Sequence, residues 1–445
     1  MQHKPTSGVD ASRKPVSNFL FGLFIYFTID FFLHFSARIP FYGALRPSIL
    51  LTLAITVLLF SQGEKFKGYT KDPEVRTIII LIAYIIVTLP FVSWPGSVLR
   101  NNIPEFVKAV SFFFFAAYIL DSDKRFRIYM TVFISCQVFR VLEPLYLHIA
   151  YGYWGDFTFV GHSGFAISSG SEFAGRLSGA PSDVVNANGL GFVIATLVPY
   201  IYYLLWCGPS KKGKLLFLIL IPLLVYALVL TLSRGALVSL CVIGWIIFKQ
   251  SRHKFVLIVV TVICAVVTWS HMTPLQKERY LSLVDSDTSQ SATASGRISG
   301  MEEEFMLGLH RPIFGHGVGT TPEAKFHIIG KARASHNLYA ELMIEIGLVG
   351  MFIFLRYMWT IYQSVKANNK FMMSDKESNQ LAFHYRLNQA MVAVFWMYAV
   401  YSMAYWGLSV YYWYLFGGLA FAARRIYFRK DADVPTATMQ PRQAI

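Results

Sequence analysis

The chain has 445 residues, of which 55% are hydrophobic, 16% are aromatic and only 15% are charged. A typical soluble domain carries about 25% charged residues, so this composition excludes a soluble protein. The net charge of +15 would suggest nucleic-acid binding in a soluble chain. In a membrane protein the same excess of Lys and Arg lies in cytoplasmic loops and sets topology, so no nucleic-acid partner is expected.

Long apolar runs recur from Asn18 to Phe428. Each run of about 17–25 residues is long enough to cross about 30 Å of hydrocarbon as a helix. The runs are continuous rather than alternating, which disfavours a β-barrel. We therefore predict an all-α integral membrane protein with about twelve transmembrane helices, near 17–35, 47–62, 77–93, 104–120, 127–150, 186–206, 215–232, 234–249, 254–271, 337–362, 388–408 and 409–427. The seventh and eighth spans, and the last two, are expected to be joined by tight turns.

Basic residues between the spans predict the orientation of the chain. If the N-terminal tail lies inside, every cytoplasmic connection is basic, as the inside-positive bias requires. Those connections are near 64–76, 121–127, 207–214, 249–254 and 366–386. The expected organisation is a cytoplasmic tail over 1–16, a membrane domain over 17–427 and a cytoplasmic tail over 428–445. We expect a multi-pass protein of an inner membrane.

Two outer loops are long in this arrangement, one near 151–185 and one near 272–336. The second loop contains a polar stretch over 282–296, which is expected to be mobile. Residues 297–309 then carry apolar side chains near helical spacing. This pattern predicts a short amphipathic helix on the outer surface of the membrane.

Two features inside the predicted spans bear on packing. The aromatic runs Phe112–Phe115 and Tyr411–Tyr414 are expected to face lipid or the membrane interface. Gly347 and Gly350 are spaced for close approach of another helix. The four cysteines show no metal-ligand spacing, and no metal site is expected.

Three arginines on the outer side are candidates for ligand binding, namely Arg176, Arg234 and Arg297. An arginine at the mouth of a helical bundle is costly unless it pairs or faces water. Arg234 lies between two apolar helices without an acidic neighbour in sequence, and a phosphate would satisfy its guanidinium in bidentate fashion. The alternatives are that Arg234 reaches lipid headgroups, that Arg176 caps backbone carbonyls and that Arg297 lies on a solvated helix face.

His336 and Asn337 open the tenth predicted span. A histidine can accept or donate a proton near neutral pH, although a histidine at a helix start is also common as a cap or an interface residue. Glu341 and Glu345 follow Asn337 at spacings of four, so the three side chains share one helix face. Carboxylates inside a membrane helix need a partner or a wet cavity.

The ordered motifs of the chain resemble the bacterial O-antigen ligase and O-antigen polymerase family of membrane glycosyltransferases. The most specific block runs from RPIFGHGVG, at 311–319, to SHNLYAELMIEIG, at 335–347. The other segments that carry the resemblance are 91–108, 176–191, 232–240 and 295–320. Family members commonly have proline before the asparagine that corresponds to Asn188, whereas this chain has Ala187, a departure that affects loop shape more than the proposed site.

The resemblance implies a GT-C-like helical bundle with a large periplasmic loop. Such an enzyme transfers glycan from undecaprenyl diphosphate to an acceptor hydroxyl at the periplasmic face, without a sugar nucleotide, a metal or another cofactor. The acceptor is lipid A-core in ligases, a repeat unit in polymerases, or a protein in related oligosaccharyltransferases. The resemblance assigns Arg176, Arg234 and Asn337 to substrate binding, and Arg297 and His336 to catalysis, with His336 as general base.

The sequence is also compatible with two classes of protein that are not enzymes, a transporter and an inactive scaffold. About twelve helices also fit a transporter, for example a flippase for lipid-linked oligosaccharides. Transporters usually contain two related halves with sites at the midplane, and this chain shows no such repeat. An inactive scaffold is disfavoured by the intact set of arginines and histidine.

Overall fold

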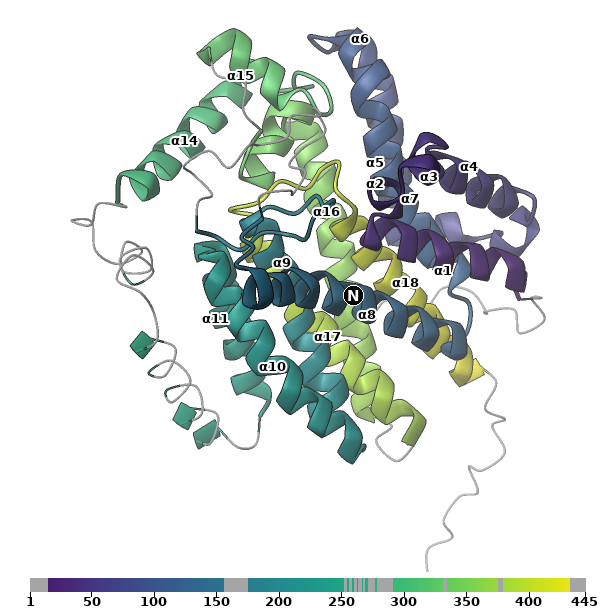
Figure 1. Cartoon of the computed structure of the whole chain (residues 1–445). Coiled ribbons are helices and arrows are strands. Elements are labelled where there is room, and N and C mark those ends of the chain that lie inside the picture. The colour runs from purple at the N-terminus through teal and green to yellow at the C-terminus, as the bar shows by residue number, and fades with distance from the viewer. Residues whose placement is uncertain are drawn as a thin grey trace, which may run out of the picture.

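The computed structural model describes residues 15–155, 175–251, 291–330, 334–374 and 379–432, together with scattered residues between 254 and 277. Within these ranges the chain is helical and contains no strand, as predicted (Figure 1). The longer helices are α1 (Asn18–Leu33), α4 (Pro47–Phe60), α5 (Pro73–Thr88), α7 (Ile103–Ile119), α8 (Asp123–Tyr151), α9 (Ala187–Ile201), α10 (Lys211–Thr231), α11 (Arg234–Gln250), α14 (Ser291–Leu309), α15 (Thr321–Ile329), α16 (Leu338–Ser374), α17 (Asn379–Tyr401) and α18 (Tyr411–Ala432). Shorter elements are α2 (Phe35–Arg38), α3 (Pro40–Ala44), α6 (Pro95–Ser97), η1 (Gly63–Phe66), η2 (Tyr69–Lys71), η3 (Leu89–Phe91), η4 (Val98–Asn102) and η5 (Tyr202–Trp206).

Local sequence signals set many of the helix starts. A side-chain oxygen directly before the helix accepts a hydrogen bond from a backbone N–H of the first turn, which would otherwise have no partner. Proline occupies the first position of α4 and α5, where its missing N–H has no consequence. The capping residues are Ser17, Ser122, Asn186, Ser210 and Ser233.

Six helical segments in the described part of the chain are long and apolar enough to cross a membrane. They are Pro73–Phe91, Pro95–Ile119, Asp123–Tyr151, Ala187–Trp206, Lys211–Thr231 and Leu338–Asn369. Pro47–Phe60 and Gly63–Lys71 add a seventh if this pair, bent by 78°, is one span. The protein is thus a multi-pass membrane protein, and the count of about twelve spans stays a prediction. One reason is that α1 and α11 have only 16 and 17 residues. Most of the predicted span 254–271 lies outside the described residues.

Several connections that the charge pattern assigns to one side of the membrane meet at one end of the bundle. Side chains from the C-terminal helix, from 64–76, from 121–127 and from the start of α17 contact one another there. The contacts join Arg424 with Asp72 at 2.9 Å, the rings of Tyr69 and Tyr118 at 5.2 Å, and His384 with Asp123 at 2.6 Å. This agrees with the predicted arrangement of the loops, while the identity of that side stays a prediction.

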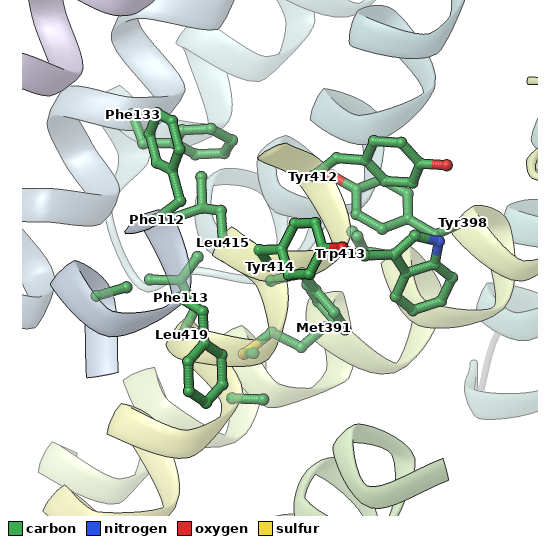
Figure 2. Packing of buried hydrophobic residues seen from close by; sticks show 14 of the residues in the cluster. Phe112, Phe113, Phe133, Met391, Tyr398, Tyr412, Trp413, Tyr414, Leu415 and Leu419 are labelled. Carbon is green, nitrogen blue, oxygen red and sulfur yellow. The ribbon is translucent and has the colours of Figure 1, made fainter. Parts of the chain in front are cut away.

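The aromatic runs of α7 and α18 form the core of the bundle. Phe112, Phe113, Tyr412 and Tyr414 are at most 1% exposed. Figure 2 shows the phenylalanines of α7 packed among the α18 side chains. A Cβ atom at Gly418 would lie 2.6 Å from the carbonyl oxygen of Phe113, so this glycine allows α18 to approach α7 closely. The prediction that these runs face lipid is therefore wrong.

The two predicted tight turns have different outcomes. α10 ends at Thr231 and α11 begins at Arg234, which confirms the first turn. α17 ends at Tyr401 and α18 begins at Tyr411, so a loop over 402–410 replaces the second predicted turn. That prediction is wrong. The segment 402–408 has the apolar composition of a membrane helix, but it does not continue α17 and instead packs against the start of α16.

The described part of the second outer loop is largely helical. The helix predicted over 297–309 is present as part of α14, which begins earlier, at Ser291. Residues 291–296 are therefore helical, contrary to the predicted mobile stretch, while 282–290 lie outside the described residues. In Figure 1, α14 and α15 lie together beyond the ends of α10 and α11, and both contact α16. Residues 156–174 of the first outer loop are not described.

Helix α16 is broken at Gly347, where φ is 66° and ψ is −176°. The segment 312–317 runs beside the break and supplies its missing hydrogen bonds, since the amides of His316 and Gly317 donate to the carbonyls of Ile344 and Glu345 at 2.7 and 2.9 Å. A Cβ atom at Gly347 would lie 2.3 Å from the carbonyl oxygen of Ile313. The role of Gly347 is thus the break itself, rather than the predicted helix packing.

Gly350 has the role that its spacing predicts. A Cβ atom there would lie 2.8 Å from the ring of Tyr84, so the missing side chain lets α5 pack closely against α16. The hydroxyl of Tyr84 donates to the carbonyl of Ile346 at 2.8 Å, next to the break. These contacts fix α5, α16 and the segment 312–317 to one another.

Candidate functional site

Arg176 lies on an extended segment that pairs with the end of α10. Its Nε donates to the carbonyl of Thr231 at 2.9 Å, and the amide of the next residue, Leu177, donates to the carbonyl of Leu230 at the same distance. Its Nη2 donates to Oδ1 of Asn188, in the first turn of α9, at 2.7 Å. Arg176 therefore does cap a backbone carbonyl, as the alternative reading proposes. The same bonds hold its guanidinium where α9 and α10 meet.

Arg234 is the first residue of α11 and is only 8% exposed. The chain reverses just before it through Leu232, which has a φ of 50°, and Ser233, whose Oγ accepts the amide of Ala236 at 3.3 Å. Helix α9 crosses this turn closely, because a Cβ atom at Gly191 would lie 2.9 Å from Cβ of Ser233. The turn that carries Arg234 is therefore the same one that Arg176 holds by the carbonyl of Thr231.

His336 precedes the first turn of α16 and is exposed. Its ring lies 5.9 Å from the ring of Trp406, in the loop 402–410. This loop is bound directly to the start of α16, because the amide of Leu338 donates to the carbonyl of Ser402 at 2.8 Å. His336 therefore sits where α16 begins and α17 ends.

Asn337 has a structural role in this arrangement. Its Oδ1 accepts the amides of Tyr339 at 2.8 Å and Ala340 at 3.3 Å, so it caps α16. The residue is 2% exposed. The cap uses the Oδ1 of Asn337, and the predicted role of Asn337 in substrate binding stays a prediction.

Two contacts join helix α9, whose first turn binds Arg176, to the end of α17 and the loop 402–410 beside His336. The hydroxyl of Tyr401, at the end of α17, donates to the backbone carbonyl of Asn188 at 2.6 Å. The ring of Phe192 in α9 stacks on that of Tyr405 at 5.2 Å. The structure thus brings Arg176, Arg234 and His336 to the same end of the bundle, opposite the end where Arg424 meets Asp72.

The two carboxylates of α16 hold loops in place. Oε2 of Glu341 accepts the amides of Gly407 at 2.7 Å and Leu408 at 3.3 Å. Oε2 of Glu345 accepts the amide of Gly319 at 2.7 Å, and its Oε1 accepts the hydroxyl of Thr321 at 2.8 Å. The expectation that these buried carboxylates need partners is confirmed, and the partners come mainly from the backbone of two loops.

Arg297 lies in the first half of α14, and its side chain is outside the described part of the structure. About two helical turns later, Glu304 fixes α14 to the loop that carries His336. Oε2 of Glu304 accepts the hydroxyl of Ser335 at 2.7 Å, while Oε1 accepts Nζ of Lys325 in α15 at 2.5 Å. The helix with Arg297 is thus attached directly beside His336.

A buried ion pair supports the segment that carries Arg176. Asp183 is 1% exposed, and its carboxylate accepts two hydrogen bonds from Arg140 of α8, at 2.8 and 3.0 Å. His34 lies 3.1 Å from the same carboxylate. Burial favours the neutral acid, but the Arg140 guanidinium and His34 outweigh it and hold the pKa of Asp183 well below its ordinary value. Asp183 stays charged and fixes the loop before α9.

Sequence reasoning missed Asp183, Asn188 and Trp406 as parts of this site. Arg140 offered a signal for Asp183, because an arginine within a membrane span needs a nearby carboxylate. Asn188 lies within the motif 176–191 but has no charge to distinguish it. Trp406 gave no signal, since its segment was read as part of a span.

The arrangement is suited to holding an anion next to an imidazole. The N-terminal ends of α9, α11 and α16 all lie here, and each helix N-terminus carries partial positive charge. Arg176 and Arg234 add two full positive charges. In the described part of the chain, no three His, Cys, Asp or Glu side chains group as metal ligands.

Fold and site together define a multi-pass helical membrane protein with buried arginines and an exposed histidine at one end of its bundle. Residues 215–355 match the family model described as O-antigen ligase. This region includes Arg234, Arg297 and His336, and the match supports the assignment to the O-antigen ligase and polymerase family that the motifs predict. The family implies glycosyltransferase-like ligase or polymerase activity. No curated protein matches the chain.

Proposed function

We propose that the protein is a metal-independent glycosyltransferase that moves a glycan from undecaprenyl diphosphate to an acceptor hydroxyl at the periplasmic face of the inner membrane. The acceptor on this proposal is lipid A-core, as in O-antigen ligation. The observation that carries the proposal is the convergence of Arg176, Arg234 and His336 at one end of the bundle. The family match over 215–355 supports it independently.

The chemistry requires stabilisation of a diphosphate leaving group. The acceptor oxygen attacks the anomeric carbon of the donor glycan, and the bond from that carbon to the phosphate oxygen breaks. Negative charge then grows on undecaprenyl diphosphate. Arg176 and Arg234 stabilise this charge more in the transition state than in the ground state, which lowers the barrier.

His336 accepts the proton that the acceptor hydroxyl loses as it attacks. Direct attack inverts the configuration at the anomeric carbon. We assign Arg297 of α14 to catalysis as well, and Glu304 fixes this helix beside the loop of His336. The reaction needs no sugar nucleotide, because the glycan is already activated by its diphosphate.

The test is transfer by the purified protein in detergent, supplied with lipid-linked glycan and lipid A-core. Arg234→Ala and His336→Ala should each lose about a hundred- to a thousand-fold in rate, the usual effect of removing one contact to developing charge. Arg76→Ala is the matched control, since Arg76 is exposed near the start of α5, at the end of the bundle where Asp72 meets Arg424. Full activity of both site variants would overturn the assignment.

The same assay separates this proposal from a transporter. An enzyme turns over in detergent, whereas a flippase shows its function only across a sealed membrane. Surface polysaccharide from a deletion strain separates ligase from polymerase. Loss of all long chains on lipid A supports ligation, while a single repeat left on lipid A supports polymerisation.

A further inference from the structure

Trp406 is the aromatic residue beside His336. The indole and imidazole rings lie 5.9 Å apart and are tilted by 54°. Trp406 is partly exposed and His336 is exposed, so both can contact a ligand. Most of the other aromatic side chains near this end of α18 are buried in the core, as Tyr412, Trp413 and Tyr414 are.

A stack of rings supports the indole from behind. Trp406 stacks on Tyr405 at 4.5 Å with an angle of 21°, and Tyr405 stacks on Phe192 at 5.2 Å with an angle of 13°. Phe192 belongs to α9 and is 4% exposed. The stack therefore ties the orientation of Trp406 to the helix whose first turn binds Arg176.

The backbone around Trp406 is also fixed. Its carbonyl accepts the hydroxyl of Tyr412 at 3.2 Å, and the amide of the next residue, Gly407, donates to Glu341 at 2.7 Å. A Cβ atom at Gly407 would lie 2.3 Å from the Tyr412 hydroxyl oxygen, so a side chain there would displace Tyr412. Little conformational freedom is left for the indole to lose when a ligand binds.

A flat, partly exposed and rigidly held aromatic ring suits one class of ligand in particular. The C–H groups of a pyranose form apolar faces that stack on aromatic rings, while its hydroxyls point outward from the ring edge. We propose that Trp406 binds the acceptor sugar, stacking on the pyranose whose hydroxyl is presented to His336. This inference rests on the proposed function and assigns a residue to the acceptor rather than to the diphosphate.

The test compares Trp406→Leu and Trp406→Phe in the detergent assay, with lipid A-core from a strain that lacks this protein as acceptor. Trp406→Leu should raise the acceptor KM about tenfold and leave the donor KM within about twofold, because only the stacking surface is lost. Trp406→Phe keeps a smaller ring and should raise the acceptor KM about threefold. Trp359→Leu is the control, since Trp359 is 57% exposed on α16 and lies beyond the break at Gly347.

An unchanged acceptor KM in Trp406→Leu, or an equal rise in both KM values, would overturn the inference. The first result would mean that the indole anchors the loop at the membrane interface. If Trp406→Leu does not fold, the acceptor KM of Trp406→Phe decides alone, and a wild-type value overturns the inference. Absence of transfer by the wild-type protein would count against the proposed function itself, which keeps the two failures distinct.

Discussion

Arg176 donates through Nη2 to the side-chain oxygen of Asn188 at 2.7 Å, so the segment before α9 is bound to the first turn of that helix. The backbone carbonyl of Asn188 accepts the Tyr401 hydroxyl at 2.6 Å. The side chain of Asn188 thus orients the Arg176 guanidinium, while its backbone carbonyl anchors the end of α17. Substitution of Asn188 therefore tests two requirements. One is the orientation of the Arg176 guanidinium, and the other is the net positive charge around it.

Asn188→Asp should damage transfer more than Asn188→Ala. Aspartate keeps the size and the acceptor oxygen of asparagine, but its negative charge offsets Arg176 where the diphosphate binds. We expect a loss of about a hundredfold in kcat/KM for Asn188→Asp and about tenfold for Asn188→Ala, with melting temperatures within about 3 °C of the wild type. If the site binds no anion, the order of the two variants reverses.

Glu304→Ala and Lys325→Ala should show strong coupling in a double-mutant cycle. Glu304 binds both Lys325 and Ser335, so its loss frees α14 from the loop of His336. We expect Glu304→Ala to lower kcat/KM about tenfold and Lys325→Ala less, with the double variant no worse than Glu304→Ala. Losses that simply add would show that the two side chains act independently.

Gly347→Ala should destabilise the protein strongly. The backbone at Gly347 adopts a conformation that only glycine reaches readily, at a strain of about 1–3 kcal/mol for other residues, and a Cβ atom would clash with the Ile313 carbonyl. Gly244→Ala is the matched control, because Gly244 lies within α11 with open space around its Cα. The measurement is the melting temperature in detergent, which should fall by more than about 5 °C for Gly347→Ala and stay level or rise for Gly244→Ala. Equal behaviour of the two variants would contradict the break as a structural requirement.

Asp183→Asn should leave the Arg140 guanidinium buried without its counter-charge, at a cost of about 3 kcal/mol. Because the pKa of Asp183 is lowered on folding, its contribution to stability is present above the unfolded value of about 3.9 and is lost only as the pH falls through the folded value. The melting temperature of Asp183→Asn should therefore stay below that of the wild type throughout the range from about pH 5 to pH 8.

An exposed ion pair provides the contrast for that experiment. Glu64 and Lys67 pair on the surface with most of their side chains exposed. Glu64→Gln should change the melting temperature by less than about 2 °C, since exposed pairs contribute little. A difference for Asp183→Asn that disappears toward pH 8 would contradict a charged Asp183.

The sequence predicts the elements whose signals are local. Apolar runs indicate the positions of most helices, and the pair Ser233 and Arg234 marks the turn between α10 and α11. The charges predict which connections meet, because Lys and Arg gather in them. Arg176, Arg234 and His336 could be singled out because charged or titratable side chains beside apolar spans require an explanation.

Features that depend on contacts between distant segments could not be predicted in the same way. Hydropathy does not separate a bundle core from a lipid-facing surface, so it predicts the wrong environment for Phe112 and Tyr412. The break at Gly347 depends on the segment 312–317, which supplies the bonds that a continuous helix would make itself. Asn337 suits both a helix cap and a ligand-binding amide, and only its hydrogen bonds to Tyr339 and Ala340 establish the cap.

The interruption at Gly347 divides α16 into two segments with different mechanical roles. The short segment that begins at Leu338 is bound by Glu341 and Glu345 to two loops. The long segment after Gly347 is the part that must adapt when the surrounding bilayer is thicker or thinner, commonly by tilting. Because backbone hydrogen bonds from 312–317 brace the break and two loops hold the short segment, we expect such tilting to leave the spacing between His336 and Trp406 unchanged.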